Sequence, residues 1–106
     1  MTQKVQSCVF CNIEPEKYIV EDEHFYAIPD HKPRCKGHTL IISKRHRENY
    51  FELDAEDAAR MQEIVLKVKK HLDEKYRPKG YRLLMNCGGA AGQIVFHFHL
   101  HVLPYY

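Results

Sequence analysis

The chain has 106 residues, of which 44% are hydrophobic and 28% are charged, and its formal net charge is +2. This length and balance predict one globular domain spanning residues 1–106 and exclude a largely disordered chain. The small net charge gives no electrostatic argument for a nucleic-acid partner. No apolar run is long enough for a signal peptide or a membrane helix, so we expect a cytoplasmic protein without a membrane partner.

The first half of the chain reads as short strands. Two strands are predicted at residues 18–20 and 25–28, joined by an acidic turn at residues 21–23. A loop containing a proline follows at residues 30–36, and an apolar run at residues 39–42 predicts a buried strand.

One long helix is predicted to begin near Asp54, which suits an N-cap, with Asp57 at the capping-box position. Pro78 and Gly80 are expected to end it after about six turns. Its apolar residues recur at spacings of three and four and form one stripe, which we interpret as core: Ala58, Met61, Val65, Val68 and Leu72.

The C-terminal part predicts two further strands. Residues 81–85 form the first, residues 86–93 form a loop of small residues, and the last strand runs from Ile94 to Leu103, where Pro104 is expected to stop it. Strands, then a helix, then strands predict an α+β fold with an antiparallel sheet.

The last strand carries three histidines on one face. Side chains alternate between the faces of a strand, so the apolar residues at even positions 94–102 are expected to face the core. The other face then presents His97, His99 and His101 in a row. Three interpretations arise: an exposed polar face, ligands of one metal, or nucleophilic catalysis.

Geometry argues against one shared metal ion. Residues four apart in a strand are separated by roughly 13 Å, whereas two nitrogens on one zinc lie about 4 Å apart. His97 and His101 cannot readily meet on one ion, so the histidines are expected to divide their roles.

A neutral imidazole is an available nucleophile at neutral pH. The glycine-containing loop before the strand offers backbone amides to an anion.

The N-terminal part contains a C-x-x-C pair, Cys8 and Cys11. Structural disulfides are not expected in the cytosol. The pair is a zinc signal that needs two further ligands. A redox-active pair and two ordinary thiols are the alternatives.

Several motifs of this sequence resemble those of the HIT (histidine triad) family, whose hallmark is His-φ-His-φ-His-φ-φ with φ hydrophobic. Residues 97–103 (HFHLHVL) match it in full, and Asn86 and residues 92–93 match the family's Asn and Gly-Gln before the triad. Residues 37–46 (GHTLIISKRH) look like its Gly-His-x-L-φ-φ-P-K-x-His segment. The resemblance covers roughly residues 8–104. It implies a HIT-like α+β fold, with an antiparallel sheet of about five strands and one long helix, usually in a homodimer.

The resemblance also implies a reaction at the α-phosphate of an adenosine or guanosine phosphate derivative, either a nucleoside phosphoramidate or a dinucleoside polyphosphate. His99 would be the nucleophile and form a nucleotidyl-histidine intermediate, with His101 and Asn86 as the other catalytic residues. The implied substrate contacts are Ile28 at the base, Asp30 at the ribose, and His38, Asn86, Gly92, Gln93 and His101 at the phosphate.

A subset of the family binds zinc through the N-terminal C-x-x-C, the histidine that ends the Gly-His segment, and the first histidine of the triad. In this sequence those residues are Cys8, Cys11, His46 and His97. The resemblance therefore implies one structural zinc per chain and no organic cofactor.

One departure from the family concerns Ile94, which stands where many members have Ser or Thr donating to the phosphate or leaving oxygen. The loss of this hydroxyl supports an alternative function, a nucleotide-binding regulatory module with little or no turnover. A third hypothesis is a zinc hydrolase, which a closed set of four protein ligands disfavours.

Overall fold

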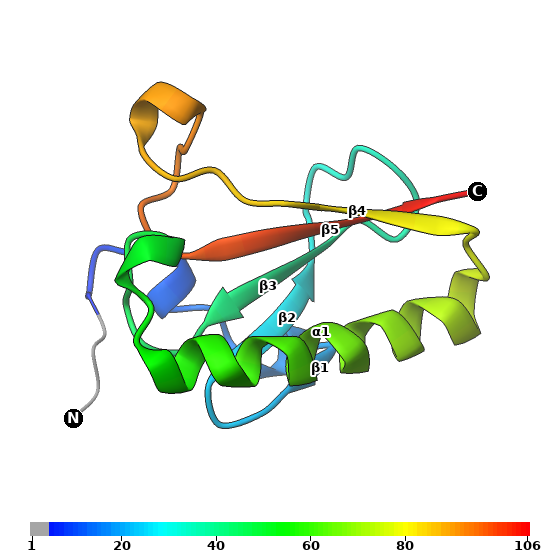
Figure 1. The fold of residues 1–106 in the computed structure, drawn as a ribbon, viewed down its shortest axis with the longest axis horizontal. Coiled ribbons are helices and arrows are strands. Elements are labelled where there is room, and N and C mark those ends of the chain that lie inside the picture. Colours follow the sequence, from blue (N-terminus) through cyan, green and yellow to red (C-terminus); the bar gives the residue numbers. More distant parts are fainter. Residues whose placement is uncertain (1–4) are drawn as a thin grey trace.

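The structure is a computed structural model that describes residues 5–106. Its strands form one sheet in the order β1-β2-β3-β5-β4, and every neighbouring pair is antiparallel (Figure 1). The strands are β1 (Val20–Glu21), β2 (Phe25–Pro29), β3 (Thr39–Ser43), β4 (Gly80–Leu84) and β5 (His99–Tyr105). Short 3-10 helices lie at Val9–Cys11 (η1), Pro15–Lys17 (η2), Tyr50–Glu52 (η3) and Gly89–Ala91 (η4). The predicted α+β fold with a five-stranded antiparallel sheet and one long helix is confirmed.

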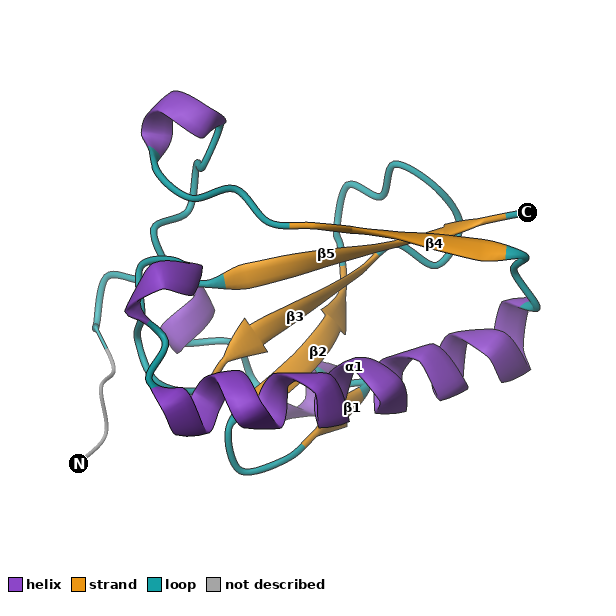
Figure 2. Cartoon of the chain, in the orientation of Figure 1, coloured by secondary structure: helices purple, strands orange, loops and turns teal. Residues whose placement is uncertain are grey.

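The helix α1 (Ala55–Tyr76) runs along one face of the sheet (Figure 2). Asp54 is its N-cap as predicted, and its carboxylate accepts from the Asp57 backbone N–H at 2.8 Å. The helix ends when Arg77 adopts a left-handed conformation at φ 54°, directly before Pro78.

The buried stripe of α1 differs in part from the prediction. Val68 and Leu72 are buried, but Ala58 is exposed and Ile64 is fully buried. The true stripe also includes Asp57 at its N-terminal end. A buried carboxylate is not expected from an apolar pattern, because it needs a charged partner that only the tertiary structure supplies.

The sheet has two different faces. One packs against α1 and forms the main core, which consists of Phe25, Ala27, Ile41, Ile64, Val68, Leu72, Phe98, Leu100 and Val102. The opposite face carries a smaller apolar cluster of Tyr26, Ile28, Leu40 and Ile42. His101 pairs with Leu40 and His99 with Ile42. Because directly paired residues share a face, these two histidines lie on the side of the sheet away from α1.

The last strand is shorter at its start than predicted. β5 begins at His99, and Ile94 is 86% exposed while Phe96 is 48% exposed, so neither belongs to the core. Alternation alone suggested a strand there, but within residues 5–106 no strand pairs with residues 94–98.

At its other end β5 runs on through Pro104, which pairs with Tyr81, so the predicted stop at this proline was wrong. Pro104 is tolerated because the ladder with β3 ends at Val102 and only β4 pairs with β5 beyond it.

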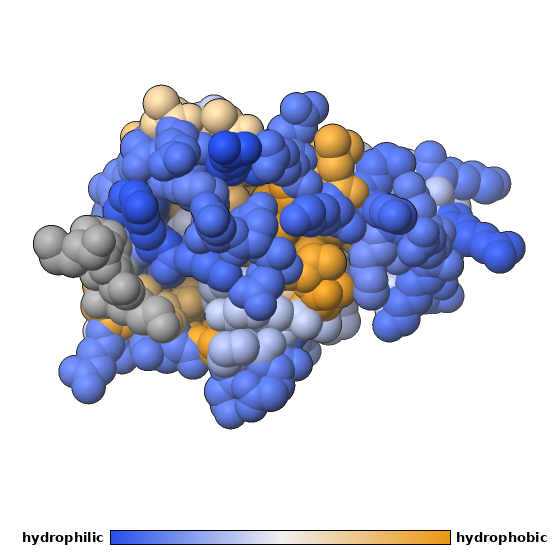
Figure 3. All heavy atoms as spheres, turned by 90° about the horizontal axis from the view of Figure 1, so that it is seen from below, coloured by the Kyte–Doolittle hydropathy of each residue, from blue (hydrophilic) through white to orange (hydrophobic). Residues whose placement is uncertain are grey.

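The surface over α1 is mostly hydrophilic, with hydrophobic side chains limited to small patches (Figure 3). Among residues 5–106, no helix combines the length and the apolar composition needed to cross a membrane.

Candidate functional site

Four predicted metal ligands come together at one end of the sheet. Cys8 is the N-cap of η1 and Cys11 is its last residue, His46 follows β3 and His97 precedes β5. The Cys8 Sγ lies 3.3 Å from the His97 Nδ1, and the Cys11 Sγ lies 3.2 Å from the His46 Nδ1 and 3.5 Å from the His97 Nδ1. Ligand atoms on one tetrahedral zinc lie roughly 3.5 Å apart, given bonds of about 2.3 Å to sulfur and 2.1 Å to nitrogen.

The donor chemistry of this cluster fits Zn²⁺. His97 is fully buried, and its Nε2–H donates to the Ser43 carbonyl at 2.7 Å. That bond fixes the tautomer and leaves the Nδ1 lone pair facing the thiols, an orienting contact typical of zinc-bound histidines. Burial lowers the pKa of His97 to about 4, so the ring stays neutral. Two sulfurs and two imidazoles form a closed set of the kind found in structural zinc sites.

His99 lies beside this cluster on the open face of the sheet. Its Nδ1 is 2.8 Å from the His97 carbonyl oxygen. A carbonyl can only accept, so the Nδ1 carries the proton and the Nε2 keeps its lone pair. The ring also meets the edge of Phe10 at a centroid distance of 5.1 Å. In the neutral ring the bond to the His97 carbonyl leaves the Nε2 as the nitrogen with the lone pair.

A chain of hydrogen bonds places the proton of His101 on the other ring nitrogen, the Nε2. The Arg34 backbone N–H donates to the Nδ1 of His38 at 3.1 Å, so the proton of His38 sits on its Nε2. This Nε2 lies 2.9 Å from the Nδ1 of His101 and 3.4 Å from the Oδ2 of Asp30. The Nδ1 of His101 is thereby an acceptor, and its Nε2–H is available as a donor. The ring centroids of His99 and His101 are 5.2 Å apart.

The same three side chains, Asp30, His38 and His101, are close enough to hold a metal ion. The tautomer of His38 argues for a hydrogen-bonded relay instead, because its Nε2 carries a proton while its Nδ1 is occupied by the Arg34 N–H. Burial lowers the pKa of His38, and burial also lowers the pKa of His101 to about 4. Both rings are therefore neutral at neutral pH.

The loop before the triad turns sharply at Gly88 and Gly92, whose φ values are 94° and 95°. Gln93 is buried, and its side-chain oxygen accepts from the Gly88 N–H at 2.7 Å while its amide NH₂ donates to the carbonyls of Glu48 and Val95. The Asn86 NH₂ donates to the Gly92 carbonyl at 3.4 Å. In this structure Gln93 shapes the loop from within, and the phosphate role expected for it stays a prediction.

The expected base contact Ile28 is buried in the small apolar cluster beside the histidines. Phe10, Ile13 and Tyr18 pack against that cluster, and Tyr18 stacks on Tyr26 at 4.3 Å. Sequence reasoning missed these three residues. An aromatic residue inside the C-x-x-C pair was the one available signal, because zinc at the pair would bring Phe10 to the triad.

A five-stranded antiparallel sheet that carries a cysteine–histidine cluster beside a histidine pair is the arrangement of a histidine triad protein. Residues 12–106 match the HIT domain, and the chain belongs to the HIT family.

Three similar proteins bear on the site. A zinc-bound histidine triad family protein from Mycobacterium smegmatis has 38% identity and a TM-score of 0.84, with 94% of this chain and 76% of that chain covered. A hypothetical histidine triad nucleotide-binding protein from Sulfolobus tokodaii has 40% identity and a TM-score of 0.87, covering 93% and 69%. The adenylylsulfatase HINT3 of Arabidopsis thaliana is 35% identical over 101 residues, which are 92% of this chain and 51% of that protein.

Proposed function

We propose that this protein is a nucleotide hydrolase or transferase that acts at the α-phosphate of nucleoside phosphoramidates or dinucleoside polyphosphates through a nucleotidyl-His99 intermediate. The observation that carries the proposal is the bond from the His99 Nδ1–H to the His97 carbonyl, which leaves the Nε2 lone pair free. Similarity to a nucleotide-binding protein and to an adenylylsulfatase supports a nucleotide substrate and a hydrolytic reaction.

In the first step, the lone pair of the His99 Nε2 forms a bond to the α-phosphorus. The bond from phosphorus to the leaving group breaks, and the leaving group departs with that electron pair and takes up a proton from solvent water. The ring of His99 becomes cationic, and the His97 carbonyl stabilises it through the Nδ1–H. The His101 Nε2–H donates to a phosphate oxygen, where charge develops.

In the second step, a water oxygen attacks the phosphorus and gives up a proton to solvent, while the bond to the Nε2 breaks and leaves its electron pair on that nitrogen, which returns neutral His99 and releases the nucleoside monophosphate. A different acceptor in place of water makes the same site a transferase. Asp30 at the ribose, Ile28 at the base, and Asn86, Gly92 and Gln93 around the phosphate complete the proposed substrate contacts.

The proposed metal is one structural zinc per chain, held by Cys8, Cys11, His46 and His97. When bound, it joins the N-terminal segment to the residue before β5 and takes no part in phosphate chemistry. We assign no organic cofactor. The proposed working form is a cytoplasmic homodimer.

Ile94 favours a second candidate function, a nucleotide-binding module with little turnover. It is 86% exposed beside the glycine loop and has no hydroxyl to donate. Turnover assays decide between the two functions.

The test uses the zinc-loaded protein with an adenosine phosphoramidate, adenosine phosphosulfate and a diadenosine polyphosphate. We expect turnover of at least one substrate, and a loss of at least about 10³-fold in kcat in His99→Ala with nucleotide binding retained. His71→Ala, on α1, is the matched histidine control and should keep wild-type turnover. Turnover that survives His99→Ala would overturn the mechanism, and binding without turnover in the wild type would support the module.

A further inference from the structure

The peptide group between His97 and Phe98 is held on both sides. Its carbonyl accepts from the His99 Nδ1, at 2.8 Å, and its N–H donates to the Arg47 carbonyl, at 2.5 Å. The two groups of a trans peptide point in opposite directions. The peptide group that orients His99 is therefore held on its opposite side by the segment that begins at the last residue of β3.

That segment, residues 43–48, accepts several bonds from the residues before β5. The carbonyls of Ser43, Arg47 and Glu48 accept from the His97 ring, the Phe98 N–H and the Gln93 amide, respectively. We call segment 43–48 the template, because its backbone carbonyls hold residues 93–98 in place. The position of the template decides the position of the peptide behind His99.

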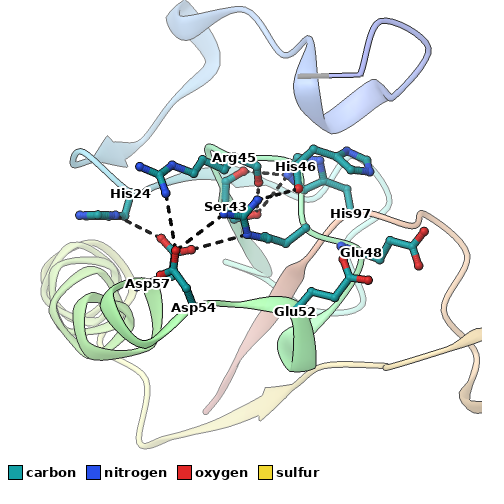
Figure 4. Close-up of polar contacts among 10 residues, drawn as sticks. His24, Ser43, Arg45, His46, Glu48, Glu52, Asp54, Asp57 and His97 are labelled. Atoms are coloured by element: carbon teal, nitrogen blue, oxygen red, sulfur yellow. Dashed lines mark hydrogen bonds and ion pairs between the residues drawn. The ribbon is translucent and has the colours of Figure 1, made fainter. Parts of the chain in front are cut away.

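The template is anchored to the first turn of α1 through the Arg47 side chain, which is only 17% exposed. Its guanidinium lies 3.7 Å from the Oδ2 of Asp54 and 3.9 Å from the Oδ2 of Asp57, and it also donates to the His46 carbonyl at 3.3 Å. Figure 4 shows the two carboxylates side by side at the helix start, facing the segment that carries Ser43 and His46.

The buried carboxylate of Asp57 explains why the Arg47 side chain is held in one position. The Asp57 side chain is 3% exposed, its Oδ1 lies 3.2 Å from the Nδ1 of His24, and its Oδ2 has no hydrogen-bond partner among the described residues. The Nε of Arg47 lies 3.9 Å from that oxygen. A buried carboxylate without its cation is strongly unfavourable, so Asp57 holds Arg47 in one place.

We propose that Arg47 is a positioning residue for His99. Its side chain is fixed by Asp57 and Asp54 on α1, its carbonyl fixes the 97–98 peptide, and that peptide holds His99 with its proton on Nδ1. A bond to the peptide N–H also polarises the carbonyl and strengthens it as an acceptor. The inference rests on the proposed function of His99. It means that α1, on the opposite face of the sheet, controls the orientation of the nucleophile through Arg47.

The test compares zinc-loaded full-length Arg47→Gln, Arg47→Lys and Asp57→Asn with the wild type. Arg45→Gln is the matched control, because Arg45 lies 3.6 Å from the same Asp54 oxygen but, within residues 5–106, forms no ion pair with Asp57 and no hydrogen bond to Phe98. Nitrogen NMR of the histidine rings reads the tautomer of His99, and steady-state kinetics separate kcat from KM.

In Arg47→Gln we expect His99 to populate both tautomers and kcat to fall about tenfold, with KM changed less than about twofold. Arg47→Lys should recover part of both effects, Asp57→Asn should shift both in the same direction, and Arg45→Gln should match the wild type. A purely structural role would lower the melting temperature and leave the tautomer and kcat unchanged.

An unchanged His99 tautomer together with unchanged kcat in Arg47→Gln would overturn the proposal. If Arg47→Gln does not fold, the same result in both Arg47→Lys and Asp57→Asn would overturn it. If the wild type shows no turnover, the proposed function fails, while the NMR measurement still decides whether Arg47 orients His99.

Discussion

Three different hydrogen-bond partners determine which ring nitrogen carries the proton in His97, His99 and His101. The Ser43 carbonyl takes the Nε2–H of His97, the His97 carbonyl takes the Nδ1–H of His99, and the Nε2–H of His38 meets the Nδ1 of His101. In their neutral forms the three rings therefore differ, with a lone pair on the Nδ1 of His97 facing the cysteines, a lone pair on the Nε2 of His99 and a donor at the Nε2 of His101. Sequence spacing predicted that the roles divide, but it does not contain these partners, which are Ser43 at the end of β3, His38 directly before β3 and the backbone carbonyl of His97 itself.

Other single-residue expectations depended on surroundings that spacing does not contain. Asp30 was expected at the ribose and His38 at the phosphate, and the structure places both beside His101. The side chain of Gln93 faces inward instead, because its amide satisfies buried backbone groups of the loop. Which way a polar side chain of a loop turns is decided by such unsatisfied groups.

Burial of His101 predicts a dependence of stability on pH. Its pKa is lowered from 6.5 to about 4 in the folded protein, chiefly by burial. Between these values the unfolded chain binds a proton that the native ring does not, so stability is full above pH 6.5 and falls as the pH drops toward 4. The shift corresponds to roughly 3 kcal/mol of the free energy of unfolding.

Urea unfolding of zinc-loaded protein at several pH values between 7 and 4 measures this effect. Because zinc release is common to both proteins, the difference between the wild type and His101→Gln isolates the ring. We expect the wild type to lose more stability than the variant as the pH falls. Parallel pH profiles would contradict a lowered pKa of His101 in the folded protein.

At the scale of elements, the long helix and most strands followed from periodicity and capping residues, whereas the start of β5 did not. The exposed Ile94 and Phe96 continue the alternation of the strand but meet no partner strand. Pairing is a property of two segments, and the pattern of one segment does not contain it. The stripe on α1 was misplaced at Asp57 for the same reason, since Arg47 and His24 lie elsewhere in the chain.

The loop between β2 and β3 carries Asp30 and depends on Gly37 at its end. Gly37 has φ +88°, and a Cβ there would lie 3.0 Å from Tyr76 and 3.1 Å from Pro104. We predict that Gly37→Ala lowers the free energy of unfolding by roughly 1–3 kcal/mol. Gly80→Ala is the matched control, because nothing lies within 4 Å of its Cβ position, and it should be neutral or slightly stabilising.

Chemical denaturation of the two glycine variants tests the contrast. Equal stabilities would mean that the left-handed turn and the contacts with Tyr76 and Pro104 do not constrain the loop.

For the whole molecule, the cysteine–histidine cluster joins the N-terminal segment to the sheet. A metal bound only by the native protein adds its binding free energy to folding. We predict that chelation lowers the melting temperature by about 10 °C or more, and that Cys11→Ser loses both the metal and this sensitivity. Cys35→Ser, a cysteine outside the cluster, should keep both.

Metal analysis and thermal melts with and without chelator check this prediction. Stoichiometric zinc in Cys11→Ser, with a melting temperature that still responds to chelator, would contradict the assigned ligand set.

The central claim is that His99 forms a covalent bond to the α-phosphorus. Its most direct test is to quench a single turnover of an adenosine phosphoramidate and to map the adenylylated residue by mass spectrometry under conditions that preserve phosphoramidate bonds. We predict one adenylyl group on His99 of the wild type and none in His99→Ala. Turnover without an adduct on His99, or an adduct on another residue, would contradict the account.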